Sequence, residues 1–265
     1  MTKSDTPVLL EKRDGVARIR FNRPHSLNAI SPELAQCFLQ CCREIQTYAE
    51  CRAVLVSGEG RSFMAGGDLS RFYQDFGNSA ETARSMIEPM NEALSILVSS
   101  PIPVVASVQG QVAGAGMSIV LACDLAIASS DVQFSFGYSQ IGASPDVGMS
   151  WSLPRIVGLR QAMAIALLGE RISSDRALDH GIVNRVVSVE NLVSVTDHLM
   201  SALASGPTIA YGHAKRLLRT SSDRSFEQQL SEELAAFRTC PATDDFMQGV
   251  SAFIEKRKAV TFGGA

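Results

Sequence analysis

The chain has 265 residues, of which 46% are hydrophobic and 19% are charged, and its formal net charge is −3. This composition predicts a folded protein with one substantial core, and the weak acidic balance gives no electrostatic reason to bind nucleic acid. The six cysteines lack the paired spacing of a zinc site, so we expect reduced thiols and no metal. The sequence contains no apolar signal core and no run long enough to cross a bilayer, so we expect a cytoplasmic protein without a membrane segment.

In chain order, the first predicted unit is a pair of strands within residues 8–21, joined by the turn sequence Asp14-Gly15. A helix should begin after Ser31, because this serine can cap it and Pro32 suits a first turn. Further strands are expected at 53–57, near 104–108, and at 124–128, 132–135 and 183–187. Further helices are expected at 69–74, 80–99, 117–123, 151–168 with breaks at Pro154 and Gly158, from Ser173, and in several pieces after 189. The alternation predicts an α/β fold with a parallel sheet, a catalytic core over 1–200 and a helical C-terminal region over 201–265.

Two glycine-containing segments are the main functional signal. Residues 106–118 lead from a strand through Gly114 and Gly116 into an apolar helix, and residues 61–68 contain Gly66 and Gly67. Bare backbone N–H groups at the start of a helix suit an anionic oxygen that needs no side chain to hold it. Glycines that only allow a helix to pack closely on a strand would produce the same pattern, so the pattern alone does not distinguish an oxygen-binding site from close packing.

Taken together with the motifs at 123–128, 153–158, 169–173, 181–186 and 251–257, these segments resemble the crotonase family, also called the enoyl-CoA hydratase/isomerase superfamily. The motifs are most similar to those of the phenylacetate-pathway-type enoyl-CoA isomerases. The resemblance implies a crotonase fold, a spiral of strand-strand-helix units followed by a helical region for trimerisation. It also implies an acyl-CoA substrate, with coenzyme A as part of the substrate and no separate cofactor, and a homotrimer or a dimer of trimers.

The resemblance also assigns roles to individual residues. It makes the N–H groups of Gly67 and Ala115 the two donors to the thioester oxygen. The implied contacts to the coenzyme A part of the substrate are Arg23, His25, Ala65, Gly67, Asp68, Phe253 and Lys256, the last two sometimes toward the substrate of a neighbouring subunit. Simpler interpretations compete with several of these: the charged residues can be solvated surface groups, and Asp68 can cap the helix that follows it.

The two glutamates of the family's hydratases fall on Ser118 and Tyr138, and neither is a strong base at neutral pH, since a free tyrosine has a pKa of about 10. The loop sequence Pro145-Asp146-Val147-Gly148 instead resembles family isomerases that use this aspartate to move a proton. One carboxylate suffices for a 1,3-shift, because it can remove a proton from one carbon and return it to another. Pro-Asp-x-Gly is also a turn signature, and Tyr138 could serve only in packing or as a hydrogen-bond donor.

These observations predict a Δ3-to-Δ2 enoyl-CoA isomerase in which Asp146 shuttles the proton. Two alternatives remain open: a hydratase (a lyase) that activates water through Asp146 and Tyr138, and a non-catalytic protein that binds acyl-CoA. A dehydrogenase is excluded, because the glycines at 114 and 116 lack the full dinucleotide-binding spacing.

Overall fold

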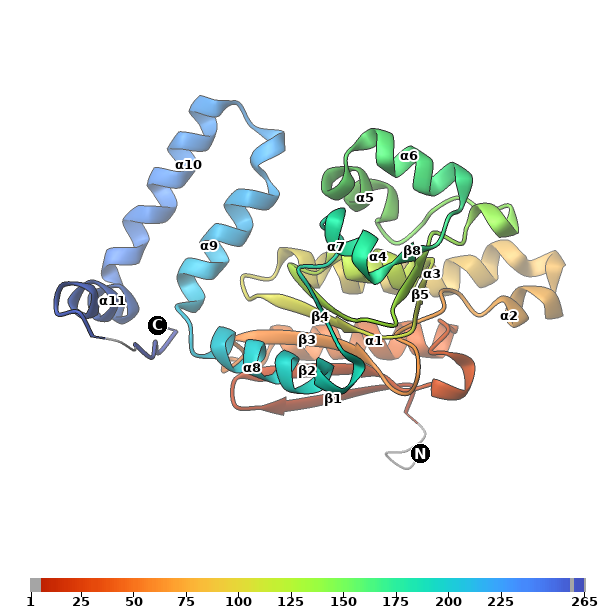
Figure 1. Ribbon diagram of the computed structural model, residues 1–265, viewed down its shortest axis with the longest axis horizontal. Coiled ribbons are helices and arrows are strands. Elements are labelled where there is room, and N and C mark those ends of the chain that lie inside the picture. The colour runs from red at the N-terminus through yellow and green to blue at the C-terminus, as the bar shows by residue number, and fades with distance from the viewer. Residues whose placement is uncertain (1–5, 258–259, 265) are drawn as a thin grey trace.

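A computed structural model describes residues 6–257 and 260–264 (Figure 1). Its main sheet has six strands in the spatial order β1-β2-β3-β4-β6-β9. The bounds of these strands are β1 Val8–Arg13, β2 Val16–Phe21, β3 Ala53–Gly58, β4 Val104–Val108, β6 Leu125–Ser129 and β9 Arg185–Val187. β1 is antiparallel to β2 and every other neighbouring pair is parallel. A smaller sheet has the order β5-β7-β8, with bounds β5 Gln111–Ala113, β7 Gln133–Ser135 and β8 Ile172–Ser173.

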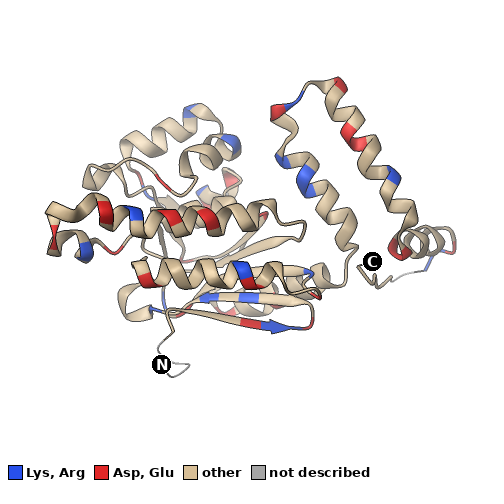
Figure 2. Ribbon diagram, turned by 180° about the vertical axis from the view of Figure 1, so that it is seen from behind, with Lys and Arg blue, Asp and Glu red and all other residues tan. Residues whose placement is uncertain are grey.

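Eleven helices are present in the described residues, and those up to α8 lie around these sheets (Figure 1). Their bounds are α1 Pro32–Gln46, α2 Leu69–Gln74, α3 Ser79–Ser99, α4 Ala115–Ala122, α5 Met149–Val157, α6 Leu159–Leu168, α7 Ser174–Asp179, α8 Leu192–Ala204, α9 Thr208–Arg219, α10 Phe226–Thr239 and α11 Asp244–Ile254. α1 packs on β1 and β2 beside α3, and α8 packs on β2, β3, β4 and β6. Figure 2, seen from behind the view of Figure 1, shows acidic and basic residues interspersed along the long helices. No helix among the described residues is long and apolar enough to span a bilayer.

Local sequence explains most of the predicted elements. The β1-β2 turn forms with φ of 51° at Asp14 and 74° at Gly15, as a tight hairpin requires. The Ser31 hydroxyl accepts a hydrogen bond from the N–H of Leu34, which confirms the predicted cap of α1. The buried face of α1 includes Phe38, whose ring lies 5.3 Å from that of Phe21 in the sheet.

Several predicted boundaries differ from those of the structure: α4, for example, begins at Ala115 instead of 117, and β5 and β8 were not predicted. α5 continues through Pro154 and ends before Gly158, because the fixed φ of proline is compatible with a helix that can forgo one hydrogen bond. The last strand starts at Arg185 instead of 183. Residue 200, where the sequence places the end of the core, lies within α8, and the three helices α9 to α11 follow it.

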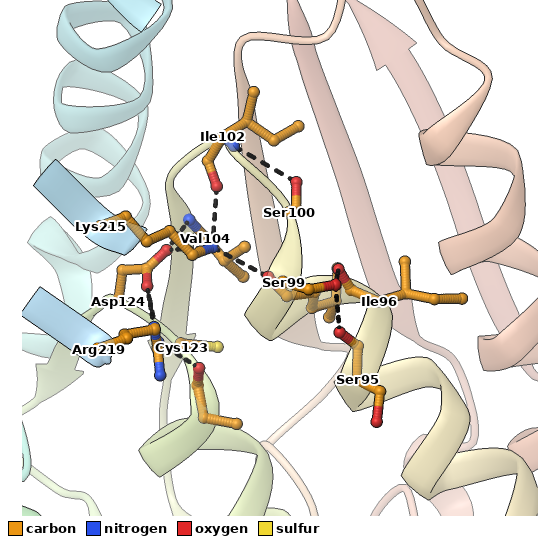
Figure 3. Close-up of polar contacts among 12 residues, drawn as sticks. Ser95, Ile96, Ser99, Ser100, Ile102, Val104, Cys123, Asp124, Lys215 and Arg219 are labelled. Atoms are coloured by element: carbon orange, nitrogen blue, oxygen red, sulfur yellow. Dashed lines mark hydrogen bonds and ion pairs between the residues drawn. The ribbon is translucent and has the colours of Figure 1, made fainter. Parts of the chain in front are cut away.

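These last helices extend to one side of the sheets as an arm (Figure 1). α9 is tied to the core by Asp124, whose two carboxylate oxygens contact Lys215 Nζ at 2.8 Å and Arg219 Nη2 at 2.6 Å (Figure 3). The Asp124 carboxylate also accepts a hydrogen bond from the N–H of Val104 at the start of β4. The arm is therefore held to the core by charge along the second half of α9.

Candidate active site

A cavity of about 650 Å³ lies between α2, α3, the start of α4 and the loop that precedes α5. Its described walls are mainly apolar. They include Ile30, Leu69, Phe72, Tyr73, Phe76, Ala83, Met86, Ile87, Met90, Ile141, Ala143 and Val147. Polar groups enter it at the glycine segments and at Tyr138 and Asp146, together with Ser79 and Ser144. A cavity with apolar walls and a few converging polar groups has the general form of a small-molecule site.

Gly67 and Ala115 reach this cavity from two different segments. Gly114, with φ of 50°, follows β5 and precedes α4, so that Ala115 is the first residue of the helix and its N–H has no intrahelical acceptor. Gly67 pairs with Ile30 in an isolated parallel bridge. Within the described part of the chain, neither N–H donates to a protein acceptor. Both are therefore available to an oxygen atom in the cavity.

Gly116 explains how the two segments come so close. A Cβ atom at this position would lie 2.7 Å from the carbonyl oxygen of Met64 and 2.9 Å from its Cβ. The N–H of Ala113 also donates to that same carbonyl. Only glycine lets α4 pack directly against the segment that carries Gly67.

Asp146 is the carboxylate of the cavity, and two hydroxyl groups hold it. Tyr138 Oη donates a hydrogen bond of 2.5 Å to Asp146 Oδ1. Ser118 Oγ donates to the backbone oxygen of Asp146 at 3.2 Å and lies 3.4 Å from Tyr138 Oη. Burial raises the pKa of Asp146 from its ordinary value, and the hydrogen bond from Tyr138 opposes this rise.

The same arrangement keeps the Tyr138 hydroxyl protonated. Burial and the neighbouring Asp146 carboxylate both raise the pKa of the Tyr138 hydroxyl above its ordinary value of 10.0. The Tyr138 side chain is buried, and its ring contacts that of Phe136 at 5.1 Å. At neutral pH it is therefore a protonated donor to Asp146.

Comparison with known proteins identifies this architecture. The model of the family described as "Enoyl-CoA hydratase/isomerase" matches residues 11–264. The chain is 32% identical to the 1,2-epoxyphenylacetyl-CoA isomerase of Escherichia coli (strain K12), covering 94% of this chain and 96% of that protein. This chain belongs to the enoyl-CoA hydratase/isomerase family. It is an enzyme of the crotonase superfamily, as its motifs predicted.

Other members of the family are similarly related to it. The short-chain-enoyl-CoA hydratase of Clostridium acetobutylicum is 32% identical, covering 96% of this chain and 97% of that protein. The crystal structure of an enoyl-CoA hydratase from Polaromonas sp. JS666 has a TM-score of 0.89 at 31% identity, covering 96% of this chain and 98% of that one. The predicted crotonase fold is thereby confirmed, while isomerases and hydratases are comparably similar in sequence.

Several predicted site residues meet in this crotonase-fold cavity. Ala65, Gly67, Ala115, Tyr138 and Asp146 all line it. They come from segments far apart in the chain, which the resemblance had placed together. Their roles in binding and catalysis remain predictions.

The residues predicted to contact coenzyme A near the N-terminal loop have different surroundings. The Arg23 guanidinium pairs with Asp68 at 3.1 Å and donates to the backbone oxygen of Ala29, so it is already engaged within the protein. The Asp68 carboxylate precedes α2 without a side-chain hydrogen bond that caps it, and instead accepts from Arg23 and from the hydroxyl of Ser70. His25 is exposed in a short turn of 3-10 helix.

Phe253 and Lys256 lie elsewhere. Phe253 is near the end of α11 with 83% of its surface exposed, and Lys256 follows it with φ of 56°. Neither is among the residues that line the cavity. Figure 1 shows α11 at the far end of the arm from α2 and α3.

Met86 and Met90 have helical spacing typical of core packing, and the resemblance also implied that their helix forms a wall of the acyl pocket; in the fold both residues line the cavity. Sequence reasoning missed one feature of the site, the backbone conformation beside Asp146. Val147, next to Asp146, has φ of 51°, a conformation that a β-branched residue rarely adopts. No signal in the sequence predicts that conformation, because Val147 is held by its surroundings.

Proposed function

We propose that the enzyme is a Δ3-to-Δ2 enoyl-CoA isomerase that uses Asp146 as its proton shuttle. The observation that supports this is the pairing of Asp146 with Tyr138 in a cavity where Asp146 is the sole carboxylate among the described lining residues. A water held between two carboxylates, as in the family's hydratases, has no equivalent in that set, because Ser118 and Tyr138 occupy the corresponding positions.

The proposed reaction begins with the thioester oxygen bound to the N–H groups of Gly67 and Ala115. These donors polarise the carbonyl and stabilise the enolate that forms when a proton leaves the adjacent carbon. The Asp146 carboxylate removes this proton from the α-carbon, and the double bond moves toward the thioester. Asp146 then returns the proton to the γ-carbon, so that no water is consumed and the mass of the substrate does not change.

The acyl group should be apolar and uncharged. The described walls of the cavity carry no lysine, arginine or histidine that could pair with an acidic acyl group. Phe72, Met86 and Met90 instead offer apolar surface, and two of them have flexible thioethers that adapt to irregular shapes. A carboxylate on the acyl group would be buried there, beside Asp146, without a cationic partner, at a large cost in free energy.

The decisive test is to incubate the purified protein with 3-enoyl-CoA and with 2-enoyl-CoA and to follow absorbance and mass. Conversion of 3-enoyl-CoA to the conjugated thioester without a mass change is expected, and Asp146→Asn should lower its rate at least a hundredfold, in line with loss of general acid–base catalysis. Addition of water to 2-enoyl-CoA that survives Asp146→Asn would contradict the assignment and favour a hydratase. Binding without any conversion would favour a non-catalytic protein.

The unfolding temperature of the Asp146→Asn variant shows whether its loss of activity comes from misfolding. The raised pKa of Asp146 means that the ionised carboxylate is less favourable in the folded than in the unfolded protein. At neutral pH the asparagine variant should therefore unfold at the same temperature as the wild type or at a higher one. Its advantage should decrease as the pH falls through the raised pKa toward the ordinary value of 3.8, because the wild-type carboxyl then becomes neutral as well.

We also propose that the subunits assemble as a homotrimer or a dimer of trimers through the arm. Leu230, Leu234 and Phe237 lie along one side of α10 at helical spacing, and all are exposed in the single chain. A contiguous apolar face of this kind favours contact with another subunit. Light scattering should give a mass of three or six chains, and Leu234→Glu with Phe237→Glu should yield smaller species, whereas an unchanged wild-type-like mass would argue against this face.

A further inference from the structure

Arg23 and Asp68 form an ion pair beside the glycine segment of the cavity. Arg23 Nη2 lies 3.1 Å from Asp68 Oδ2, and the two side chains are only 18% and 14% exposed. Burial by itself would raise the pKa of Asp68, but the hydrogen bonds from Ser70 and Arg23 and the charge of Arg23 outweigh it and hold that pKa below its ordinary value. Asp68 is therefore ionised and paired at neutral pH.

The ion pair joins two loops whose backbones are already connected by hydrogen bonds. The N–H of Ile30 donates to the oxygen of Gly66 at 2.8 Å, and the N–H of Asp68 donates to the oxygen of Ile30 at 2.9 Å. Arg23 also donates to the backbone oxygen of Ala29, so its guanidinium is bound to the first of these loops at the residue before Ile30. Gly67 lies between the two bonded residues, Gly66 and Asp68.

The Gly67 N–H belongs to the same planar peptide unit as the Gly66 carbonyl, which accepts the hydrogen bond from the Ile30 N–H. The Ile30 N–H in turn shares a peptide unit with the Ala29 carbonyl, which accepts from Arg23. Gly67 adds no side-chain contact, since apart from its chain neighbours no heavy atom lies within 4 Å of the position that its Cβ would occupy. On the other side of Gly67, Asp68 pairs with Arg23, so the orientation of the Gly67 N–H is linked to Arg23 through both of its neighbours.

We infer that Arg23 and Asp68 are a positioning pair that orients the Gly67 N–H toward the thioester oxygen. This rests on the proposed role of Gly67 as a donor to that oxygen. It replaces the expectation that Arg23 binds a phosphate of coenzyme A, since the guanidinium is occupied by Asp68 and Ala29. Loss of either member of the pair should lower carbonyl polarisation without removing a direct contact to the substrate.

The two interpretations of Arg23 make opposite predictions for Asp68. If Arg23 binds a phosphate, Asp68→Asn releases the guanidinium and tightens binding of coenzyme A, whereas Arg23→Met weakens it. If the two residues are a positioning pair, neither variant should tighten binding of coenzyme A, and both should lower polarisation of the carbonyl. The double variant should be no worse than Arg23→Met alone, because that substitution already breaks the ion pair together with the bond to Ala29.

The test uses the absorbance of cinnamoyl-CoA bound to the protein, because hydrogen bonds to the carbonyl of a conjugated thioester shift its absorption to longer wavelength. It is measured in the Asp146→Asn background, in which the proposed proton transfer is blocked. Adding Arg23→Met or Asp68→Asn should remove most of the absorption shift that the Asp146→Asn protein shows. In otherwise wild-type protein, each should lower kcat about ten- to a hundredfold, the effect of misplacing one oxyanion donor, with KM changed much less. Arg23→Lys should retain part of both signals, because it keeps the charge but loses the fork that reaches Ala29.

The matched control is the pair of Arg20 and Glu59, which are 2.9 Å apart on the exposed surface. Arg20→Met should leave the shift and kcat unchanged. A shift that persists in both positioning variants, or tighter coenzyme A binding in Asp68→Asn alone, would overturn the inference and leave the isomerase proposal intact. If Asp146→Asn protein itself binds cinnamoyl-CoA without a shift, the proposed role of Gly67 is refuted, and the positioning role with it.

Discussion

At the scale of single residues, Tyr138 and Asp146 shift the pKa values of each other's side chains. Burial of the Asp146 carboxyl disfavours its charged form, whereas the hydroxyl of Tyr138 stabilises the charge by a hydrogen bond of 2.5 Å. A carboxyl with a raised pKa is a better proton carrier, because it gives and takes the proton nearer to the working pH. Tyr138 thus sets how far the pKa rises, and Ser118 holds the backbone on which Asp146 is carried.

Tyr138→Phe should move the acidic limb of the pH profile of kcat/KM to higher pH. The limb reports ionisation of the base, and loss of the donor destabilises the carboxylate and so raises the pKa of Asp146. A hydrogen bond to a charged group contributes about 1.5–3 kcal/mol, which corresponds to about one to two pH units. Tyr48→Phe, outside the cavity, is the control. A limb that stays in place or moves to lower pH would show that Tyr138 does not stabilise the ionised base.

At the scale of elements, the site depends on the contact between α4 and the segment that carries Gly67. The two donors come from segments that touch where Met64 faces Gly116. Protein interiors are packed closely enough that one additional methyl group has to displace its neighbours. The spacing of the two N–H groups is therefore linked to a residue that contacts no substrate.

Gly116→Ala should lower the free energy of unfolding by about 1–3 kcal/mol, the usual cost of overpacking a core. It should also reduce kcat, since the added Cβ would push α4 away from the Met64 carbonyl. Denaturant unfolding and steady-state rates measure the two effects. Gly77→Ala is the control, because its Cβ would meet only the Asp75 carboxylate, at an ordinary 3.5 Å. Full stability in Gly116→Ala would mean that the contact relaxes easily.

At the scale of the whole molecule, two charged side chains outside the C-terminal arm, Asp124 and Arg52, bind residues of the arm. Asp124 binds Lys215 and Arg219 of α9, and the Lys215 side chain is only 8% exposed (Figure 3). Lys215 also donates to the backbone oxygens of Leu97 and Ile102, which ties α9 to the end of α3. At the start of α9, Arg52 donates to Thr208 Oγ1 and to the backbone oxygen of Phe262.

Asp124→Asn should destabilise the protein by about 3 kcal/mol or more, because it leaves two poorly exposed cations without their counter-charge. Release of α9 should appear as faster hydrogen exchange in α9 to α11 than in the sheet. Glu232→Gln, which breaks the exposed pair between Arg216 and Glu232, should cost less than about 1 kcal/mol. Equal effects of the two substitutions would contradict a special role for Asp124.

The sequence by itself determined the hairpin at Asp14-Gly15, the cap at Ser31, the strands of the main sheet and most helices in their order, and the family motifs with their departures at Ser118 and Tyr138; it did not predict β5 or β8. These features depend on turn chemistry, periodicity and short motifs, all of which act between near neighbours along the chain. The tertiary structure decided the partner of Arg23, the continuation of α5 through Pro154 and the distance of Phe253 from the cavity. Each of these depends on contacts between residues that only folding brings together, so no local pattern could specify them.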